Sequence, residues 1–515
     1  MQKILEIIEK VNAAVNSVVW GWPMIALILG TGILLTVRTK ALQVRKFGAA
    51  FGDTVLSTFK DIGKKKKGKK ANAVSPFEAF ATAISGTVGT GNIVGVTSAI
   101  MTGGPGAVFW MWVSAFFGMV TNYAESVLGL YFRKRDGKGE FSGGPAYYLS
   151  EGLKDKGSFL RILGKILAVA AAVFCTFAAV GISGVQTNKI SATFQGWVAV
   201  ENGQALSLIV GIIVAVLIAL IILGGIKSIG RVASVIAPFM SVLFIGMSLV
   251  VIFSNIAAVG NAFALIFANI FKFEAGVAGV VGYAFSQIIQ KGLARGVFSN
   301  EAGLGSSVIA QSASEEKEPV KQGLWGLFGV FLVTFVICTM TALVVLVSFG
   351  NETGMKEVLY ASGAVDTVVA MKAFENTLGV FGTTVYAIVL PLFAFTTILA
   401  WAYYGEKAVE YLFRKTGEKG RKIATIIFKL LYISLIVLSA LIDGELAWAI
   451  ADTFNGLMAL PNLVGVILLS GLVVKITKNY FDRKKGIAVK PMLSAYENLE
   501  EEFILELEKG NVENE

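Results

Sequence analysis

The fold of this chain is decided by residues 77–95, which read Phe77-Glu-Ala-Phe-Ala-Thr-Ala-Ile-Ser85-Gly-Thr-Val-Gly-Thr-Gly-Asn92-Ile-Val-Gly95. The stretch begins as an apolar membrane helix, but glycine, hydroxyl and amide residues occupy its middle, where the bilayer centre should be. Unwound backbone at membrane depth persists only where protein or a water-filled cavity satisfies its polar groups. We therefore expect a helix that is broken between Ser85 and Asn92 and lines a polar cavity.

A second stretch of the same kind lies five predicted helices further along, where residues 294–306 read Ala294-Arg-Gly-Val-Phe-Ser-Asn-Glu-Ala-Gly-Leu-Gly-Ser306. One glycine-rich span alone is explained by close helix packing. Two such spans in matching places indicate two repeats that each begin with a broken helix, which is a sign of a transporter site. Because each repeat has an odd number of helices, the two repeats cross the membrane in opposite directions.

The composition supports a membrane protein. Of the 515 residues, 55% are hydrophobic and 16% are charged, whereas soluble domains carry about 25% charged residues. Apolar runs of about 20 residues, the length that crosses a bilayer, recur along the chain. They predict an all-α polytopic membrane protein with eleven transmembrane helices near residues 16–37, 77–101, 105–132, 159–185, 206–225, 230–253, 277–311, 323–348, 378–404, 424–442 and 448–474.

Several chemistries are excluded by what the sequence lacks. It contains no histidine, which removes histidine-based catalytic triads, His-ligated haem and HExxH zinc sites. The segment 63–70 matches most of a phosphate-binding loop, but Lys70 stands where a magnesium-binding Ser or Thr is required, and no strand precedes it. We therefore expect no enzyme, no cofactor, no ATP-driven step and no nucleic-acid partner.

Basic residues predict the orientation in the membrane. If segment 38–76 is cytoplasmic, the cytoplasmic segments together hold 36 Lys and Arg and the opposite segments hold 6. Because Lys and Arg accumulate in cytoplasmic loops, we expect an external N-terminus and a cytoplasmic C-terminus in the cell membrane. The net charge of +10 is then explained by these loops.

The expected organisation has six segments. They are an external amphipathic segment with an extra first transmembrane helix (1–37), a Lys-rich cytoplasmic loop (38–76), a first five-helix repeat (77–254), an external interfacial segment (255–276), a second, inverted five-helix repeat (277–474) and a cytoplasmic tail (475–515). From Pro491 onward the tail carries eight Glu and one Lys, which predicts a solvated segment. A short amphipathic helix through Phe503, Ile504 and Leu507 is the alternative.

Further motifs give the chain a family resemblance. They are Asn92-Ile-Val-Gly-Val, Gly143-Gly-Pro-Ala-Tyr-Tyr148, Gly184-Val-Gln186-x-Asn188 and the stretch Gly296–Ser306. Together with the first break, they resemble the alanine or glycine:cation symporter family (sodium:alanine symporters) over about residues 20–475. The resemblance implies the leucine-transporter-like fold of the amino acid–polyamine–organocation superfamily, with a 5+5 inverted repeat and one extra N-terminal helix. It also implies sodium-coupled uptake of small neutral amino acids such as alanine and glycine by alternating access.

The resemblance implies a sodium site at the first break. Carbonyls at the end of a half-helix coordinate cations, and the resemblance assigns this role to Ser85 and Val88. The adjacent hydroxyls of Thr396 and Thr397 would complete the site, whereas a threonine in a span otherwise bonds its own backbone. A second, more weakly indicated sodium site would use Thr87, Asn92 and Ser299.

The substrate is expected between the two breaks. N–H groups at the start of a half-helix attract anions, so the substrate carboxylate should lie near residues 90–92, and its ammonium should meet carbonyls freed around residues 296–299. Gln186 would bond the substrate or another helix, and two aromatic rings would size the cavity or pack in the core. The candidate substrate-binding residues are Thr87, Thr90, Gly91, Asn92, Gln186, Gly296, Phe298, Ser299 and Trp401.

Among the charged residues within predicted spans, Glu125, Arg295 and Glu301 need partners most clearly. Such charges pair, face the protein interior or mark a pathway. We expect structural pairing, with Glu301 against Arg295 and with Glu125 accepting hydrogen bonds from unwound backbone.

Two other functions remain open. A proton-coupled symporter of the same fold would usually carry a titratable group at the sodium position, where Thr396 and Thr397 stand. An ion channel would need a continuous pore and usually a symmetric oligomer, whereas broken helices in inverted halves favour alternating access. The leading prediction is a secondary transporter in the lipid bilayer whose ligands are sodium and a small neutral amino acid.

Overall fold

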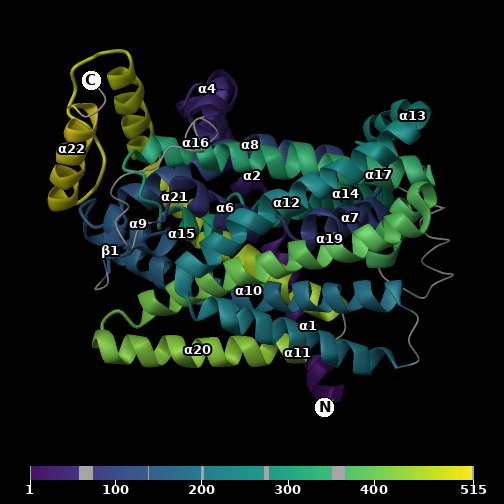
Figure 1. The fold of residues 1–515 in the computed structure, drawn as a ribbon. Coiled ribbons are helices and arrows are strands. Elements are labelled where there is room, and N and C mark those ends of the chain that lie inside the picture. Colours follow the sequence, from purple (N-terminus) through teal and green to yellow (C-terminus); the bar gives the residue numbers. More distant parts are fainter. Residues whose placement is uncertain are drawn as a thin grey trace.

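The fold is almost entirely helical, and the computed structural model describes residues 2–56, 74–136, 139–198, 202–271, 278–350, 366–442 and 444–512. Figure 1 shows long helices running roughly side by side, with α22 and β1 at one end of the molecule and α13 at the other. The elements are α1 (Gln2–Val19), α2 (Trp22–Arg38), α3 (Leu42–Arg45), α4 (Phe47–Phe51), η1 (Gly52–Leu56), α6 (Pro76–Thr87), η2 (Thr90–Asn92), α7 (Val94–Gly103), α8 (Gly106–Tyr131), β1 (Lys134–Arg135), β2 (Phe141–Ser142), α9 (Pro145–Gly152), α10 (Ser158–Trp197), α11 (Gly203–Ile222), α12 (Gly225–Ser254), α13 (Ile256–Ala268), α14 (Ala278–Asn300), α15 (Ser306–Gln311), α16 (Pro319–Val330), η3 (Phe331–Cys338), α17 (Thr339–Phe349), α19 (Asp366–Leu412), α20 (Gly417–Ser439), α21 (Gly444–Lys484) and α22 (Glu497–Val512).

Eight stretches of helix in the described residues are long and apolar enough to cross a membrane. They are α8, α10, α11, α12, the run α16–η3–α17, α19, α20 and α21, and they coincide with eight of the eleven predicted spans. Their outer faces stay apolar, as at Leu220 of α11 and Leu430 of α20, which are 66% and 61% exposed. Contiguous exposed apolar surface of this kind is what contact with lipid requires.

The predicted first span is wrong in its start. Residues 16–37 are not one helix, because α1 ends at Val19 and α2 begins at Trp22, with a bend of 41° between them. Gly21 is extended there and Pro23 follows in the first turn of α2, a position where a proline fits because the first N–H groups need no helical acceptor. The bend lays α1 against α21, where the indole of Trp20 donates to the carbonyl of Asp452 over 2.9 Å.

Several helices run further than hydropathy predicted. The fourth predicted span ends at residue 185, but α10 continues to Trp197. The ninth predicted span, 378–404, begins beside Gly379, whose non-helical φ of +58° divides α19 into two helices, and the second of these continues to Leu412. The extra turns contain polar residues that lie inside the protein. Lys189 of α10, for example, is 3% exposed and pairs with Asp366 of α19 over 2.7 Å. Hydropathy alone underestimates a helix whose polar side chains have partners inside the protein.

Two predicted spans are broken, as expected. The first consists of α6, η2 and α7, and the second of α14 and α15. Around them, α10 packs against α19 and α21, while α8 packs against α14 and α16. The buried apolar side chains of these helices form two large clusters, and both breaks lie among them.

The tail differs from the prediction of a solvated segment. Residues Glu497–Val512 form α22, and Phe503 on its inner face is only 2% exposed. α22 lies against the two-stranded antiparallel hairpin of β1 and β2. The Lys-rich run 64–70 lies outside the described residues.

Candidate functional site

The first break begins where α6 ends. Ser75 and Glu78 cap the start of α6 reciprocally, and the helix stops at Thr87, after which Val88 and Gly89 leave helical geometry. One short turn, η2, then leads into α7. The break therefore lies within the stretch that the sequence predicted.

Three oxygens converge at this break from two helices. The hydroxyl of Thr397, on α19, lies 2.9 Å from the carbonyl oxygen of Ser85 and 3.4 Å from that of Val88. It also lies 3.0 Å from the carbonyl of Phe393, one turn back on its own helix. All three residues are almost fully buried. A hydroxyl has two lone pairs besides its proton, so these three groups can face a cation together. The structure thus brings together three of the four predicted sodium ligands.

Thr396 and Thr87 lie elsewhere. The hydroxyl of Thr396 contacts the sulfur of Met240 at 3.6 Å and donates to carbonyls of its own helix, because successive residues on a helix point about 100° apart. Thr87 likewise bonds carbonyls one turn back on α6. Neither hydroxyl joins the oxygens at Thr397, which corrects the expected pair of adjacent threonine ligands.

The N–H groups of the first break are partly occupied. Gly89 N–H donates to the side chain of Asn92 over 2.9 Å, and Thr90 N–H donates to the Oε1 of Gln186 over 3.0 Å. Among the described residues, no acceptor lies on the Gly91 N–H. The hydroxyl of Thr90 is also buried without a partner. Fewer polar groups are therefore left for a ligand than the sequence predicted, because the expected row of N–H groups from residues 90 to 92 is partly occupied.

The second break lies later than predicted. α14 stays helical through Asn300, and the chain turns at Glu301, Gly303 and Gly305, whose φ angles are +56°, +92° and +72°. Glycine adopts such angles without strain, whereas they are unfavourable for glutamate. Gly296 is inside α14, where an added Cβ would meet the side chain of Ser114 at 2.8 Å. Gly296 therefore permits close packing on α8 and frees no carbonyl, contrary to the prediction.

The two breaks touch each other through short polar contacts. The side-chain amide of Asn92 donates to the carbonyl of Ser299 over 3.2 Å, and the hydroxyl of Ser299 donates to the carbonyl of Gly91 over 3.3 Å. Thr341 of α17 donates to the carbonyl of Asn92 over 2.8 Å. An added Cβ on Gly91 would come within 2.8 Å of the Phe298 ring. Phe298 and Ser299 thus lie beside Gly91, as expected of one site.

The buried carboxylates hold the second break. Asn462 of α21 donates to the buried Glu125 and also to the carbonyl of Gly303. Glu125 is therefore linked to the unwound backbone through the side chain of Asn462, whereas direct hydrogen bonds from that backbone to Glu125 stay a prediction.

Glu301 has different partners from those expected. It accepts from the hydroxyl of Ser306 and from the indole of Trp401, the latter over 3.1 Å. Arg295 instead pairs with Asp452 over 3.1 Å, so the predicted pairing of Glu301 with Arg295 is wrong. Trp401 supports the break through Glu301, and its ring packs on Tyr404.

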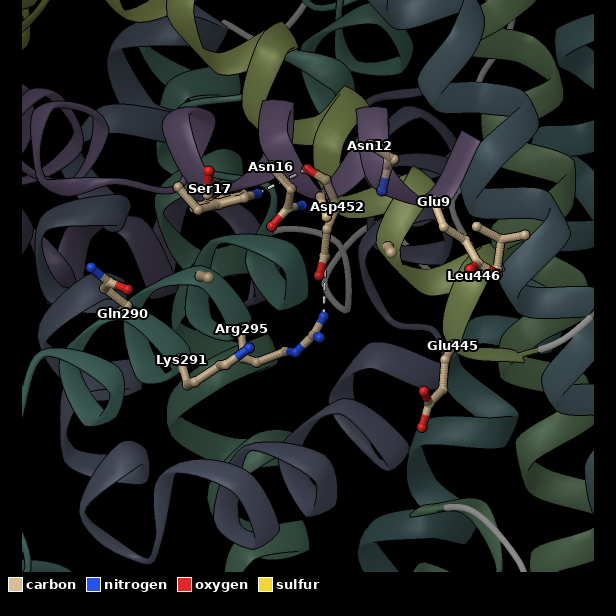
Figure 2. Close-up of a pocket in the computed structure, with 14 residues that line it drawn as sticks. Glu9, Asn12, Asn16, Ser17, Gln290, Lys291, Arg295, Glu445, Leu446 and Asp452 are labelled. Carbon is tan, nitrogen blue, oxygen red and sulfur yellow. Dashed lines mark hydrogen bonds and ion pairs between the residues drawn. The ribbon is translucent and has the colours of Figure 1, made fainter. Parts of the chain in front are cut away.

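A cavity of about 590 Å³ opens above the site between α1, α14 and α21. Figure 2 shows Arg295 reaching across it to Asp452, with Lys291 and Gln290 on the same helix as Arg295. Beside Arg295, which lines the cavity, the Phe298 ring lies 4.9 Å from the ring of Trp448, and the guanidinium of Arg295 lies 4.7 Å from Trp448. Phe298 thus contacts both Arg295 and the position beside Gly91.

Sequence reasoning missed three residues of this region, Asp452, Trp448 and Asn462. Asp452 could have been found, since it is a carboxylate inside the last predicted span, 448–474, where a charge needs a partner. Trp448 and Asn462 carry no such signal, because an isolated aromatic or amide in a span does not indicate which helix it faces.

Comparison with known proteins identifies the family to which the chain is similar. The family model described as "Sodium:alanine symporter family" matches residues 5–493. The sodium/alanine symporter AgcS of Methanococcus maripaludis is 42% identical over 489 residues, which cover 94% of this chain and 99% of AgcS.

Two solved structures support the fold. MhsT in complex with L-phenylalanine matches with a TM-score of 0.51 and 13% identity, over 79% of this chain and 98% of MhsT. A Na⁺-coupled sialic acid symporter in its substrate-bound outward-open state matches with a TM-score of 0.53 and 11% identity, over 92% of this chain and 94% of that chain. At such low identity these likenesses concern the fold, which is leucine-transporter-like.

Proposed function

The chain belongs to the sodium:alanine symporter family, and we propose that it carries alanine and other small neutral amino acids, glycine among them, into the cell together with sodium. Membership makes the chain a membrane transporter and not an enzyme. The proposal includes eleven transmembrane helices in a 5+5 inverted repeat with one extra N-terminal helix, an external N-terminus and a cytoplasmic C-terminus.

One observation carries the proposal most directly. The carbonyls of Ser85 and Val88 both lie within 3.4 Å of the Thr397 hydroxyl in a buried position. Sodium is a hard cation that prefers oxygen ligands, and carbonyls at the end of a half-helix carry partial negative charge. We assign the coupling sodium to these three groups.

The substrate fits next to this ion. We place its carboxylate at the Gly91 N–H and the Thr90 hydroxyl, the polar groups of the first break that lack a partner among the described residues. Gln186 holds the Thr90 N–H and thereby orients the turn. The ammonium faces the carbonyl end of α14, near Ser299. Because Phe298 lies directly against Gly91, the space beside the first break suits a small side chain.

The cavity above the site supports alternating access. It has a volume of about 590 Å³ and is lined by α1, α14 and α21, whereas two cavities among the described residues toward the opposite side of the breaks have volumes of about 20 and 10 Å³. We therefore interpret the structure as open to the outside, with the aromatic layer of Phe298 and Trp448 between the cavity and the site.

Transport assays test the proposal directly. Purified protein in proteoliposomes should take up labelled alanine with an inward sodium gradient, and a potassium–valinomycin voltage should increase uptake. Moving one charge through 100 mV contributes about 2.3 kcal/mol, or roughly 50-fold accumulation. Comparison of sodium, lithium and a pH gradient distinguishes sodium from proton coupling, and counterflow at zero net flux distinguishes a carrier from a channel. Uptake that ignores both sodium and voltage would contradict the proposal.

The sodium assignment has its own matched pair of variants. Thr397→Val removes the hydroxyl with little change in volume, so the sodium concentration for half-maximal uptake should rise by about tenfold or more, which corresponds to about 1.4 kcal/mol of lost binding. Thr396→Val removes the neighbouring hydroxyl, which faces Met240, and should change it by less than about twofold. Equal effects of the two variants would place the ion elsewhere.

A further inference from the structure

The C-terminal helix α22 is attached to the body of the protein by a small set of side chains. Its inner face buries Leu499 and Phe503, which are 7% and 2% exposed, together with Leu493 from the preceding segment. The Phe503 ring meets the edge of Phe141 on β2 at 5.9 Å. In the segment before the helix, the Ala495 N–H donates to the carbonyl of Tyr131 at the end of α8 over 2.8 Å.

A buried arginine lies under this contact. Arg133, between α8 and β1, is 1% exposed and donates to the carbonyls of Ser314 and Glu316 over 2.5 and 2.6 Å. Its guanidinium also lies 4.0 Å from the Phe141 ring and 5.3 Å from the Phe503 ring. Burial lowers the pKa of Arg133 to about 9, which leaves it cationic at neutral pH. Phe503 therefore covers a cation that ties the end of α8 to the segment after α15.

Ion pairs hold α22 from two sides. Arg135 of β1 makes two bonds of 2.7 Å with Glu502, and Lys317, in the segment between α15 and α16, pairs with Glu506 over 2.9 Å. The side chains in these pairs are 24 to 34% exposed. Exposed pairs contribute little each and weaken with salt. These ion pairs therefore define where α22 docks but contribute little free energy, so that α22 can detach and dock again.

The attached segments lead directly to both helix breaks. α8 carries Glu125, which holds the second break, and the segment at Lys317 follows α15, the second half of that broken span. At the turn of the hairpin, Asp136 lies 3.9 Å from the buried Lys407 of α19, the helix that carries Thr397. The hairpin is thus a junction between α8, α15, α19 and α22.

We propose that α22 is an intramolecular latch that keeps the cytoplasmic end of the transporter closed and slows each transport cycle. The inference rests on the proposed function, because it requires that this end opens during transport. The cavities described on this side of the breaks have volumes of about 20 and 10 Å³, as expected of a closed end. Opening it separates segments that α22 holds together through Arg135 and Lys317. Releasing α22 therefore lowers the cost of opening and raises the turnover rate.

A charge-swap experiment tests the latch in the full-length protein in proteoliposomes. Arg135→Glu and Glu502→Arg each place like charges together, so each should raise the turnover number of alanine uptake by about two- to fivefold, the range that loss of one exposed ion pair allows. The alanine KM and the sodium dependence should not change. The double variant Arg135→Glu/Glu502→Arg restores opposite charges and should return turnover to the wild-type value. Lys372→Glu, which breaks the exposed Lys372–Glu375 pair on α19, is the matched control and should change nothing.

A second measurement reports whether α22 has detached. The native cysteines, Cys175 and Cys338, are buried, so a cysteine introduced as Leu507→Cys, at a partly buried position of the same helix face that leaves Phe503 in place, can be labelled selectively by a polar thiol reagent. Labelling should be faster in the single charge variants and slow again in the swap. If the single variants expose position 507 while turnover stays the same or falls, α22 is only a stabilising brace and the latch is refuted. Absence of sodium-dependent uptake in the wild type would instead refute the proposed function.

Discussion

The two broken spans use their free backbone groups in different ways. At the first break, the carbonyls of Ser85 and Val88 face the Thr397 hydroxyl, and the Gly91 N–H has no acceptor among the described residues. At the second break, Asn462 donates both to Glu125 and to the carbonyl of Gly303. Backbone groups of the first break therefore stay available, whereas a buried side chain bonds the backbone of the second.

This difference suggests a division of labour between two segments that look alike in sequence. Free polar groups in a buried place are costly unless a ligand satisfies them, so the first break is suited to bind sodium and substrate. The second break has positive φ angles at Glu301, Gly303 and Gly305, and its side-chain bonds stabilise that conformation. We infer that the second break serves mainly to present the end of α14 to the first.

The largest effect is expected where the second break loses its acceptor. Glu125→Leu leaves the buried amide of Asn462 without its carboxylate, at a cost of about 1–3 kcal/mol for the unpaired donor. The variant should unfold at a clearly lower temperature in detergent. Glu125→Gln keeps one side-chain oxygen as an acceptor and should lose much less. If Glu125→Leu were as stable as the wild type, the carboxylate would not hold the second break.

A smaller and more selective effect is expected at the first break. Gly91→Ala adds a Cβ within 2.8 Å of the Phe298 ring, which crowds the substrate position but not the oxygens around Thr397. Alanine should then stabilise the purified variant against heat only at about tenfold higher concentration or more, while stabilisation by sodium remains.

The double variant Gly91→Ala/Phe298→Leu checks that the crowding is the cause. A leucine is smaller than the ring and should restore part of the alanine response. Alanine stabilisation of Gly91→Ala at the wild-type concentration would contradict the placement of the carboxylate and move the substrate toward Gln186.

The contrast between the breaks also shows what the sequence could predict. The first break was found correctly because glycine, hydroxyl and amide residues interrupt an otherwise apolar span. The second was placed too early, since Gly296 reads as a helix breaker but in fact packs against Ser114. The sequence alone does not distinguish a glycine that breaks a helix from one that permits close packing. The distinction depends on which residue of a neighbouring helix faces the glycine.

Tertiary contacts explain the other differences. Trp401 was considered as part of the cavity wall, but its indole bonds Glu301, an interaction between residues 100 positions apart. The acidic tail was expected to be solvated, because its composition is that of a disordered segment. Its few apolar residues, such as Phe503, nevertheless find a partner in Phe141. A sequence pattern cannot show a docking surface that is built by another part of the chain.

The smallest effect tests the corrected partner of Arg295. Its pair with Asp452 is largely buried, with side chains 10% and 16% exposed, and removing either charge leaves the other without its partner. A double-mutant cycle with Arg295→Gln and Asp452→Asn should therefore give a coupling free energy of about 1 kcal/mol in chemical unfolding, the scale for residues in direct contact. The parallel cycle with Arg295→Gln and Glu301→Gln should give a value near zero, because Glu301 bonds Ser306 and Trp401 at the break while Arg295 lies at the cavity. Equal coupling in the two cycles would mean that the charge at the cavity and the charge at the second break act together. In that case the division between an accessible first break and a closed second break would not hold.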